Sequence, residues 1–160
     1  MTNVVAGTGH RPPKLGGYDD YTAENLTTLA IDWLTLYKPY KPVSVISGMA
    51  LGWDQALAAA AIRLKIPFTA AVPFPGYERK WPTESIKRYT ILIGHCSELV
   101  FVSNSYNGAS TMQLRNEWMV DRCDLLLALW DGSKGGTANC IRYAERKNVK
   151  IENLWNRWTS

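Results

Sequence analysis

An unbroken apolar run at residues 125–130, Leu-Leu-Leu-Ala-Leu-Trp, limits the possible folds of this chain more than any other stretch, and Asp131 and Gly132 follow it. A strand with no alternating polar residues has both faces covered, as strands of parallel sheets do. The run therefore predicts a central strand of an α/β domain.

Short apolar runs alternate with helix-length segments along the rest of the chain. Predicted strands cover residues 4–6, 43–46, 68–72, 99–102, 125–130 and 149–154, and predicted helices cover residues 22–38, 53–65, 83–93, 112–122 and 138–147. Such alternation is typical of a parallel sheet with right-handed crossovers. We predict the α/β class: one three-layer Rossmann-like domain over residues 1–160, with a mostly parallel five- to six-stranded sheet.

Composition excludes several classes of protein. Hydrophobic residues make up 46% and charged residues 20%, which is typical of a globular chain and not of a disordered one. No apolar run approaches the roughly 20 residues that span a bilayer, and the first residues lack the pattern of a secretory leader. We expect a cytoplasmic protein with no membrane partner.

Cysteines and charge narrow the ligand class. Cys96, Cys123 and Cys140 lack metal-ligand spacing and indicate reduced thiols, so we expect neither a metal nor a cofactor. The net charge of +4 comes without a basic run, so nucleic acid is not the expected partner in this interpretation and a small anion fits as well. Seven tryptophans and eight tyrosines exceed the needs of the core, which favours aromatic side chains in a pocket or a subunit contact, Trp155 and Trp158 included.

Three glycine-containing loops follow predicted strands. They are residues 7–11 (GTGHR), 47–52 (SGMALG) and 131–137 (DGSKGGT). Ligands of parallel sheets bind at the carboxyl ends of the strands, and glycine lets backbone amides approach an anion at a helix N-terminus. The three loops together predict an anion site, most naturally for phosphate. The alternative is that these glycines only turn the chain.

Polar and aromatic side chains near these loops complete the predicted site. Arg11 could pair with phosphate, Asp54 and Asp131 could accept ribose hydroxyls, and Tyr77 or Trp81 could stack on a base. Structural alternatives are a helix-dipole role for Asp54, a turn cap for Asp131, and burial of Arg115 and Asn116 against a neighbouring loop. The residues we expect at the ligand are Gly7, Thr8, Gly9, His10, Arg11, Ser47, Gly48, Met49, Asp54, Tyr77, Glu78, Trp81, Arg115, Asn116, Asp131, Gly135, Gly136 and Thr137.

Two familiar phosphate motifs do not match. The dinucleotide fingerprint needs a third glycine where Pro12 stands, and the P-loop needs Gly-Lys-Ser/Thr, whereas Lys134 precedes two glycines and a threonine. Neither a standard NAD site nor an ATPase is supported. No Ser-His-Asp or Cys-His nucleophile emerges from the pattern.

Five stretches in order along the chain resemble a known family: GTGHRPPKLGG, SGMALGWDQALA, PFPGYERKWP, RNEWMVDRCDLLLALWDG and GGTANC. They are similar to the YpsA-like branch of the SLOG superfamily, which is named for DprA/Smf and the LOG enzymes and includes phage members. If a phage encodes this chain, the expected location is the host cytoplasm. The resemblance covers nearly the whole chain. It implies a Rossmann-like fold with a nucleotide-derived ligand at the strand ends and a homo-oligomer, a dimer or higher.

The same resemblance bears on catalysis. LOG phosphoribohydrolases carry a Gly-Gly-x-Gly-Thr loop, a catalytic glutamate shortly after it, and an arginine on the preceding helix. Gly135-Gly136-Thr137 and Arg115 look like counterparts of the loop and the arginine, but no carboxylate follows until Glu145. Asp54, Glu78 or Asp131 could substitute for the glutamate.

The leading hypothesis is a protein that binds a phosphorylated, ribose-containing ligand, such as a nucleotide, an ADP-ribose derivative or a cyclic nucleotide signal, and senses or sequesters it. The alternatives are a LOG-like N-glycoside hydrolase acting on nucleoside monophosphates and a single-stranded nucleic-acid binder.

Overall fold

A computed structural model describes residues 3–36, 42 and 44–160. Six strands form one sheet in the order β4-β3-β2-β1-β5-β6, and every pairing is parallel, which confirms the predicted α/β, Rossmann-like class. The strands are β1 (Val4–Gly9), β2 (Ser44–Ser47), β3 (Phe68–Val72), β4 (Glu98–Phe101), β5 (Leu125–Leu129) and β6 (Lys150–Asn153). The strand order reverses between β1 and β5.

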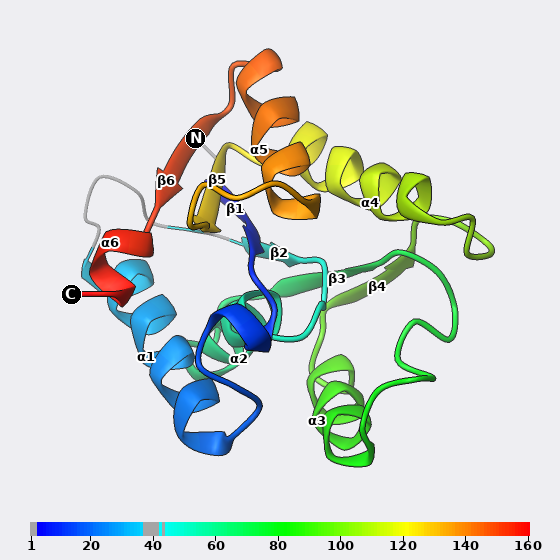
Figure 1. The fold of residues 1–160 in the computed structure, drawn as a ribbon, viewed down its shortest axis with the longest axis horizontal. Coiled ribbons are helices and arrows are strands. Elements are labelled where there is room, and N and C mark those ends of the chain that lie inside the picture. The colour runs from blue at the N-terminus through cyan, green and yellow to red at the C-terminus, as the bar shows by residue number, and fades with distance from the viewer. Residues whose placement is uncertain (1–2, 37–41, 43) are drawn as a thin grey trace.

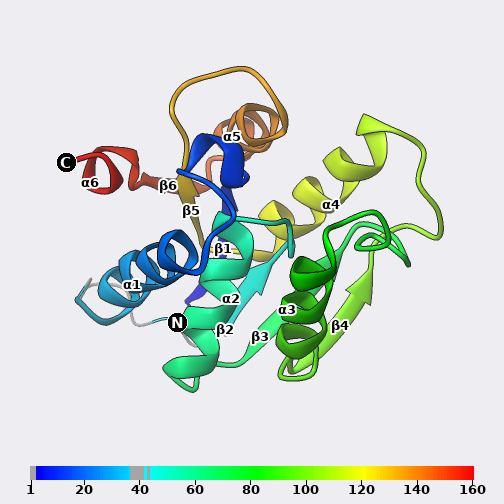
Figure 2. The same ribbon diagram turned by 60° about the horizontal axis from the view of Figure 1, so that its bottom comes forward.

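Helices cover both faces of this sheet (Figure 1). Helices α1 (Asp20–Leu36), α2 (Trp53–Arg63) and α3 (Thr83–Ile93) lie on one face, and α4 (Ala109–Arg122) and α5 (Gly136–Arg146) lie on the other. The 3-10 helix η1 (Pro12–Lys14) follows β1, and the short helix α6 (Trp155–Trp158) follows β6 near α1 (Figure 2). No helix among the described residues has the length and apolar character needed to cross a membrane.

Three helices begin earlier than the sequence predicts, and one of them is α5, which begins at Gly136 where the predicted helix starts at residue 138. The carboxylate of Asp19 accepts hydrogen bonds from the backbone N–H of Thr22 at 2.8 Å and from its hydroxyl at 3.1 Å, so α1 begins at Asp20 and the predicted start at Thr22 is wrong. Helix α4 begins at Ala109, where the predicted helix starts at residue 112, because Gly108 with a φ of 76° turns the chain into it. The predicted end of the first helix at residue 38 and the start of the second strand at residue 43 lie outside the described residues.

Strand β1 is longer than predicted. Gly7, Thr8 and Gly9 continue the strand and pair with Leu127, Ala128 and Leu129 of β5, so they are not part of a loop. Side chains of α2 occupy the space above the two glycines. A Cβ atom at Gly9 would lie 2.5 Å from the Trp53 ring, and one at Gly7 would lie 2.5 Å from the Leu57 side chain.

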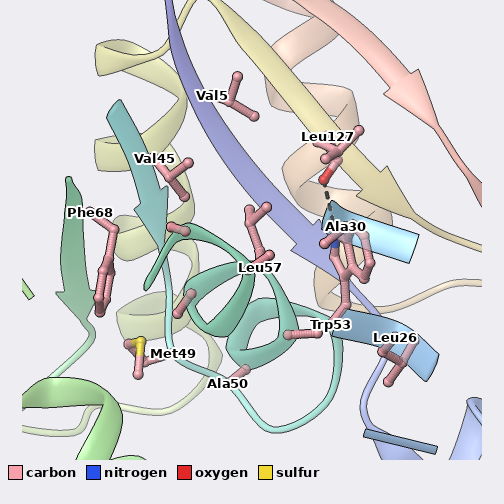
Figure 3. Packing of buried hydrophobic residues seen from close by; sticks show 14 of the residues in the cluster. Val5, Leu26, Ala30, Val45, Met49, Ala50, Trp53, Leu57, Phe68 and Leu127 are labelled. Atoms are coloured by element: carbon pink, nitrogen blue, oxygen red, sulfur yellow. Dashed lines mark hydrogen bonds between the residues drawn. The ribbon is translucent and has the colours of Figure 1, made fainter. Parts of the chain in front are cut away.

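The core beneath α1 and α2 explains this close approach. Trp53 and Leu57 are fully buried, and the Trp53 indole N–H donates to the carbonyl of Leu127 at 3.1 Å (Figure 3). All five residues of β5 have no exposed surface, as the apolar run predicts. Buried alanines on α2 bring its backbone close to the sheet. The packing of α2 therefore fixes the ends of β1 and β5 relative to each other.

Candidate functional site

A cavity of about 610 Å³ lies at the carboxyl ends of β1 and β5, beside the reversal of strand order. This is the position at which open parallel sheets bind ligands. The residues that line it are Thr8, Gly9, His10, Arg11, Pro13, Lys14, Ala50, Asp54, Ala109, Met112, Gln113, Arg115, Asn116, Ser133, Lys134, Gly135, Gly136, Thr137 and Asn139. A smaller cavity of about 310 Å³ lies between α1, α2 and α3, and no predicted site residue lines it.

The structure brings part of the predicted site together. The predicted residues that line the larger cavity are Thr8, Gly9, His10, Arg11, Asp54, Arg115, Asn116, Gly135, Gly136 and Thr137. The predicted residues outside its lining are Gly7, Ser47, Gly48, Met49, Tyr77, Glu78, Trp81 and Asp131.

The N-terminus of α5 forms the open end of the cavity. Gly135 precedes the helix with a φ of 141°, and no side chain of the described residues caps the helix start by a hydrogen bond. Apart from its chain neighbours and the nearby backbone of α5, no atom of the described residues lies within 4 Å of a Cβ placed on Gly135 or Gly136. The first amides of a helix have no partner within the helix and carry partial positive charge. This end of the cavity can therefore accept an anion on the backbone itself.

The loop between β2 and α2 is instead filled by the protein. A Cβ on Gly48 would lie 2.5 Å from the guanidinium of Arg115, which donates a hydrogen bond to the Gly48 carbonyl. The Ser47 hydroxyl donates to the Asp54 carbonyl at 2.7 Å, and Met49 is fully buried in the core. Gly48 is therefore required for contact with Arg115, and protein atoms occupy the space that the predicted anion would need at this loop.

Asp54, in the first turn of α2, has an incomplete set of partners. Its residue surface is 4% exposed, Oδ2 accepts from the backbone N–H of Ala50 at 3.4 Å, and Oδ1 is buried without a hydrogen-bond partner among the described residues. Burial raises the pKa of Asp54 to about 6, although the positive charges of Arg115 and Arg11 act in the opposite direction. At neutral pH the cavity wall thus holds a carboxylate oxygen that lacks a donor.

Arg115 and Asn116 are buried on α4, and neighbouring loops satisfy them. Beyond its bond to Gly48, Arg115 donates through Nε to the Asn116 side-chain oxygen at 3.1 Å. The Asn116 amide donates to the carbonyl of Gly136 at 3.4 Å. These contacts connect α4 to the loops that start α2 and α5, so they hold the two ends of the cavity in place.

A polar cluster missed by sequence reasoning joins the ends of β1 and β5. The Nε2 atom of His10 lies 2.8 Å from Oδ1 of Asp131, whose backbone N–H lies 3.0 Å from the same nitrogen. Ser133 donates to Asp131 from its backbone N–H at 2.9 Å and from its hydroxyl, and Lys14 contacts the Ser133 hydroxyl. Ser133 and then His10 hold the pKa of Asp131 below its usual range.

This cluster is not a catalytic triad. Asp131 lies between the serine and the histidine, so His10 contacts the carboxylate and not the Ser133 hydroxyl, whereas the histidine of a triad contacts its serine directly. Asp131 is occupied by its own turn, as the turn-cap alternative predicts. The adjacency of β1 and β5 creates the His10 pair, and strand adjacency cannot be read from residues that lie 121 positions apart.

The predicted aromatic residues pack against one another. Tyr77 is 7% exposed and meets Trp81 edge-on at 5.0 Å between ring centroids, and Trp81 meets Tyr89 at 5.4 Å. The Tyr77 hydroxyl accepts from Arg11 at 3.4 Å, which connects this aromatic cluster to the cavity rim. Glu78 lies half-buried between β3 and α3.

The cysteine thiols have no evident chemical role in this site. All three cysteines are free, and burial raises the pKa of both Cys123 and Cys140 to about 12, which keeps these thiols protonated. Within the described residues, no group of three or more His, Cys, Asp or Glu side chains could hold a metal ion.

Comparison with known proteins gives consistent results. Residues 5–156 match the family model YpsA, described as the YspA SLOG family. The SPbeta prophage-derived protein YoqJ of Bacillus subtilis is 32% identical over 126 residues, covering 69% of this chain and 73% of YoqJ. A UPF0398 protein of Bacillus cereus is 23% identical over 159 residues, covering 94% of this chain and 86% of the relative.

Solved structures share the fold at low sequence identity. DNA processing protein A (DprA) of Streptococcus pneumoniae superposes with a TM-score of 0.68 at 15% identity, covering 95% of this chain and 50% of DprA. DprA of Helicobacter pylori gives a TM-score of 0.64 at 19% identity, covering 94% of this chain and 64% of that protein. The chain thus spans half to two thirds of the length of these two proteins. The match over residues 5–156 places the chain in the YspA SLOG family.

Proposed function

We propose that the protein binds a nucleotide-derived ligand, with a phosphate at the N-terminus of α5 and a ribose beside Asp54. The observation that carries the proposal is that one cavity combines an open helix N-terminus with a buried carboxylate oxygen that lacks a hydrogen-bond donor. The space beside Gly135 and Gly136 at the start of α5 is open, and Oδ1 of Asp54 is buried without a donor among the described residues. Phosphate oxygens would accept hydrogen bonds at the helix N-terminus, and sugar hydroxyls would donate to the Asp54 oxygen.

The charges around the cavity support an anionic ligand. Arg11, Lys14 and Lys134 are exposed residues of the lining, whereas Asp54 is the only carboxylate among the described residues that line it. Because Asp131 is bound by His10 and Ser133, we assign the ribose to Asp54 alone. Base stacking on Trp81 or Tyr77 is not part of the proposal, since both rings pack within their own cluster.

Gly136→Asp tests the phosphate position. An acidic side chain at the first position of a helix suits the helix dipole, so the variant should keep its fold, while its charge repels a phosphate at the same amides. Calorimetric titration with ribose 5-phosphate and with the nucleoside 5′-monophosphates of four bases should show binding to the wild type and loss of at least ten-fold in affinity in the variant. Unphosphorylated nucleosides should bind both proteins weakly.

Thr83→Asp is the matched control. Thr83 is the exposed first residue of α3 and does not line the cavity, so the variant carries the same charge change at another helix start. It should bind like the wild type. The proposal fails if Gly136→Asp retains full affinity, or if no phosphorylated ribose shifts the melting temperature or binds in the titration. Mass spectrometry of small molecules released from heat-denatured protein would then identify what the cavity does carry.

Single-stranded nucleic acid is the second candidate ligand. The DprA protein of H. pylori has a single-stranded DNA binding mode. The likeness in fold to that protein favours a nucleic-acid ligand, whereas the charge of this chain alone does not predict one. Exposed Arg11, Lys14 and Lys134 at the rim could contact successive phosphates. This candidate predicts that oligonucleotide affinity falls steeply with salt concentration. Titration of a labelled oligonucleotide at several salt concentrations distinguishes the two ligand classes.

N-glycoside hydrolysis is a third candidate, favoured by one observation. Asp54 is the carboxylate of the cavity wall, and Glu145 lies nine residues beyond the start of α5, about 14 Å along the helix axis. Hydrolysis would require Asp54 to stabilise the cationic sugar of the transition state. Release of free base from nucleoside monophosphates, absent in Asp54→Asn, would establish it. Binding without base release would exclude it.

We also propose that the protein forms a homo-oligomer and that the bound ligand is sequestered or sensed rather than metabolised. A prophage-derived relative agrees with a role in phage biology, in which a host nucleotide signal, such as an ADP-ribose derivative, would be withheld. Trp155 and Trp158 do not support their expected role as the subunit contact, because both are half-buried against the protein's own core.

A further inference from the structure

We propose that two copies of this chain pair through the open edge of β4, antiparallel about a two-fold axis, to form a continuous twelve-stranded sheet. This edge is separate from the ligand cavity and would supply the contact behind the expected oligomer. The two edges of the sheet are β4 and β6 (Figure 1), and they differ in how they are protected.

The β6 edge is protected and the β4 edge is not. Strand β6 carries Lys150 and Glu152, and α6 follows it directly. Strand β4 has the sequence Glu-Leu-Val-Phe, with Leu99 41% and Phe101 46% exposed. Natural sheets protect free edges with charges, and an apolar free edge favours association. The contrast therefore marks β4 as the edge that a partner covers.

Helices leave much of β4 uncovered. The strand packs extensively against β3, whereas neither α3 nor α4 makes a comparable contact with it. Parallel sheets normally have both faces buried. Further exposed large apolar residues lie on the segments that precede and follow β4 in the chain: Ile91 on α3, Tyr106 in the loop and Leu114 on α4. An added strand with its own flanking helices would extend both layers.

The backbone of β4 is suited to pairing with itself. The N–H of Val102 donates to the Val72 carbonyl, so Val102 and Val100 turn their backbone groups toward β3 and Leu99 and Phe101 turn theirs outward. An antiparallel pair centred on Val100 places Leu99 opposite Phe101 of the partner subunit and repeats this pair across the axis. Both side chains lie on the face of Ala70 and Val72, their register partners.

Charge and symmetry favour a second copy as the occupant. Glu98 is the only charged residue of β4, and the proposed register places it opposite Val102 of the partner subunit rather than opposite another glutamate. Head-to-tail extension would need β4 to pair with the charged β6 edge. A closed two-fold dimer uses β4 twice and leaves no free apolar edge.

The double variant Leu99→Lys/Phe101→Lys tests the pairing. Light scattering coupled to size exclusion should give the wild type twice its monomer mass of 18.0 kDa, and the variant one monomer mass. Both side chains are already exposed, so circular dichroism and thermal unfolding should show a folded variant. The control Tyr21→Lys/Leu36→Lys adds the same charge at exposed apolar positions of α1 and should remain dimeric.

Hydrogen exchange distinguishes strand pairing from another contact. In the wild-type dimer the amides of Leu99 and Phe101 should be protected, and dilution to monomer should remove that protection. A wild type that is monomeric at all accessible concentrations would overturn the proposal and leave the edge to a strand of another protein. A dimer that survives the double variant, or that leaves both amides unprotected, would overturn it as well. Ligand titrations of the monomeric variant show separately whether the nucleotide proposal holds.

Discussion

The two ends of the cavity use glycine for opposite purposes. At the ends of β1 and β2, Gly9 and Gly48 have no side chain because Trp53 and Arg115 fill the space. At the start of α5, Gly135 and Gly136 face open space. The first pair lets the protein pack against itself, and the second pair leaves room beside the helix N-terminus for another molecule. Glycine at a strand end is therefore a sign of close approach, and only the surroundings show which molecule approaches.

Side chains at the filled end hold the open end in place. Arg115, Asn116, His10 and Asp131 connect the α5 loop to α4 and to β1, and all four interact with protein atoms. We therefore assign them the role of positioning the amides of α5 rather than of contacting the ligand. A preorganised backbone site gains affinity because little conformational freedom is lost on binding.

The largest expected effect on stability comes from replacing Asp54, which lines the cavity. Its pKa of about 6 in the folded state lies above the ordinary aspartate value of 3.8. The folded state therefore favours the protonated carboxyl group. The protonated group's contribution to the free energy of unfolding is fully present below pH 3.8 and is lost as the pH rises through 6. Asp54→Asn should be more stable than the wild type above pH 7 by about 3 kcal/mol, because each pKa unit corresponds to about 1.36 kcal/mol.

Urea unfolding of both proteins from about pH 4 to pH 8 checks this prediction, over the range in which the carboxyl group titrates. The difference in free energy of unfolding should grow with pH and level off above neutrality. A difference that does not change with pH would mean that Oδ1 is solvated in the folded protein. The same variant should lose preference for ribose over deoxyribose ligands, because the amide no longer offers a charged acceptor.

The next effect tests the filled end. Gly9→Ala places a Cβ 2.5 Å from the nearest atom of the Trp53 side chain, which is itself fixed by its bond to Leu127. We expect a loss of about 2 kcal/mol in the free energy of unfolding from overpacking. Gly7→Ala is the matched comparison, and it should cost about half as much. Its nearest neighbour is the flexible end of Leu57, which can turn away. Equal stability of Gly9→Ala and wild type would refute the packing assignment.

The smallest expected effect tests the open end of the cavity, and here the substitution should raise the free energy of unfolding instead of lowering it. Gly136→Ala adds a methyl group at a helical position where, apart from the chain neighbours and the backbone of α5, none of the described residues lies within 4 Å. Alanine restricts the unfolded chain, so the free energy of unfolding should rise by about 0.5 kcal/mol. Thermal unfolding measured beside Gly9→Ala checks the contrast. Destabilisation by Gly136→Ala would show that protein atoms already fill the open end.

The sequence predicts the layers of the fold and ten of the residues that line the cavity, for identifiable reasons. The apolar run at residues 125–129 and the alanines of α2 report burial directly, because burial depends on local side-chain character. The role of Gly9 could not be predicted, because it depends on Trp53, which lies on another element. The pairing of His10 with Asp131 depends on strand order in the same way. The start of α1 could have been predicted from Asp19, whose spacing from Thr22 is a typical cap.

Backbone amide NMR signals, followed during titration with ribose 5-phosphate, test at single residues whether the start of α5 holds the phosphate. We predict the largest changes at Gly135, Gly136 and Thr137, and much smaller changes at Gly7 and Gly48, whose surroundings are filled by protein side chains. Changes confined to Gly7 and Gly48, or no change at the start of α5 at saturating ligand, would contradict this assignment.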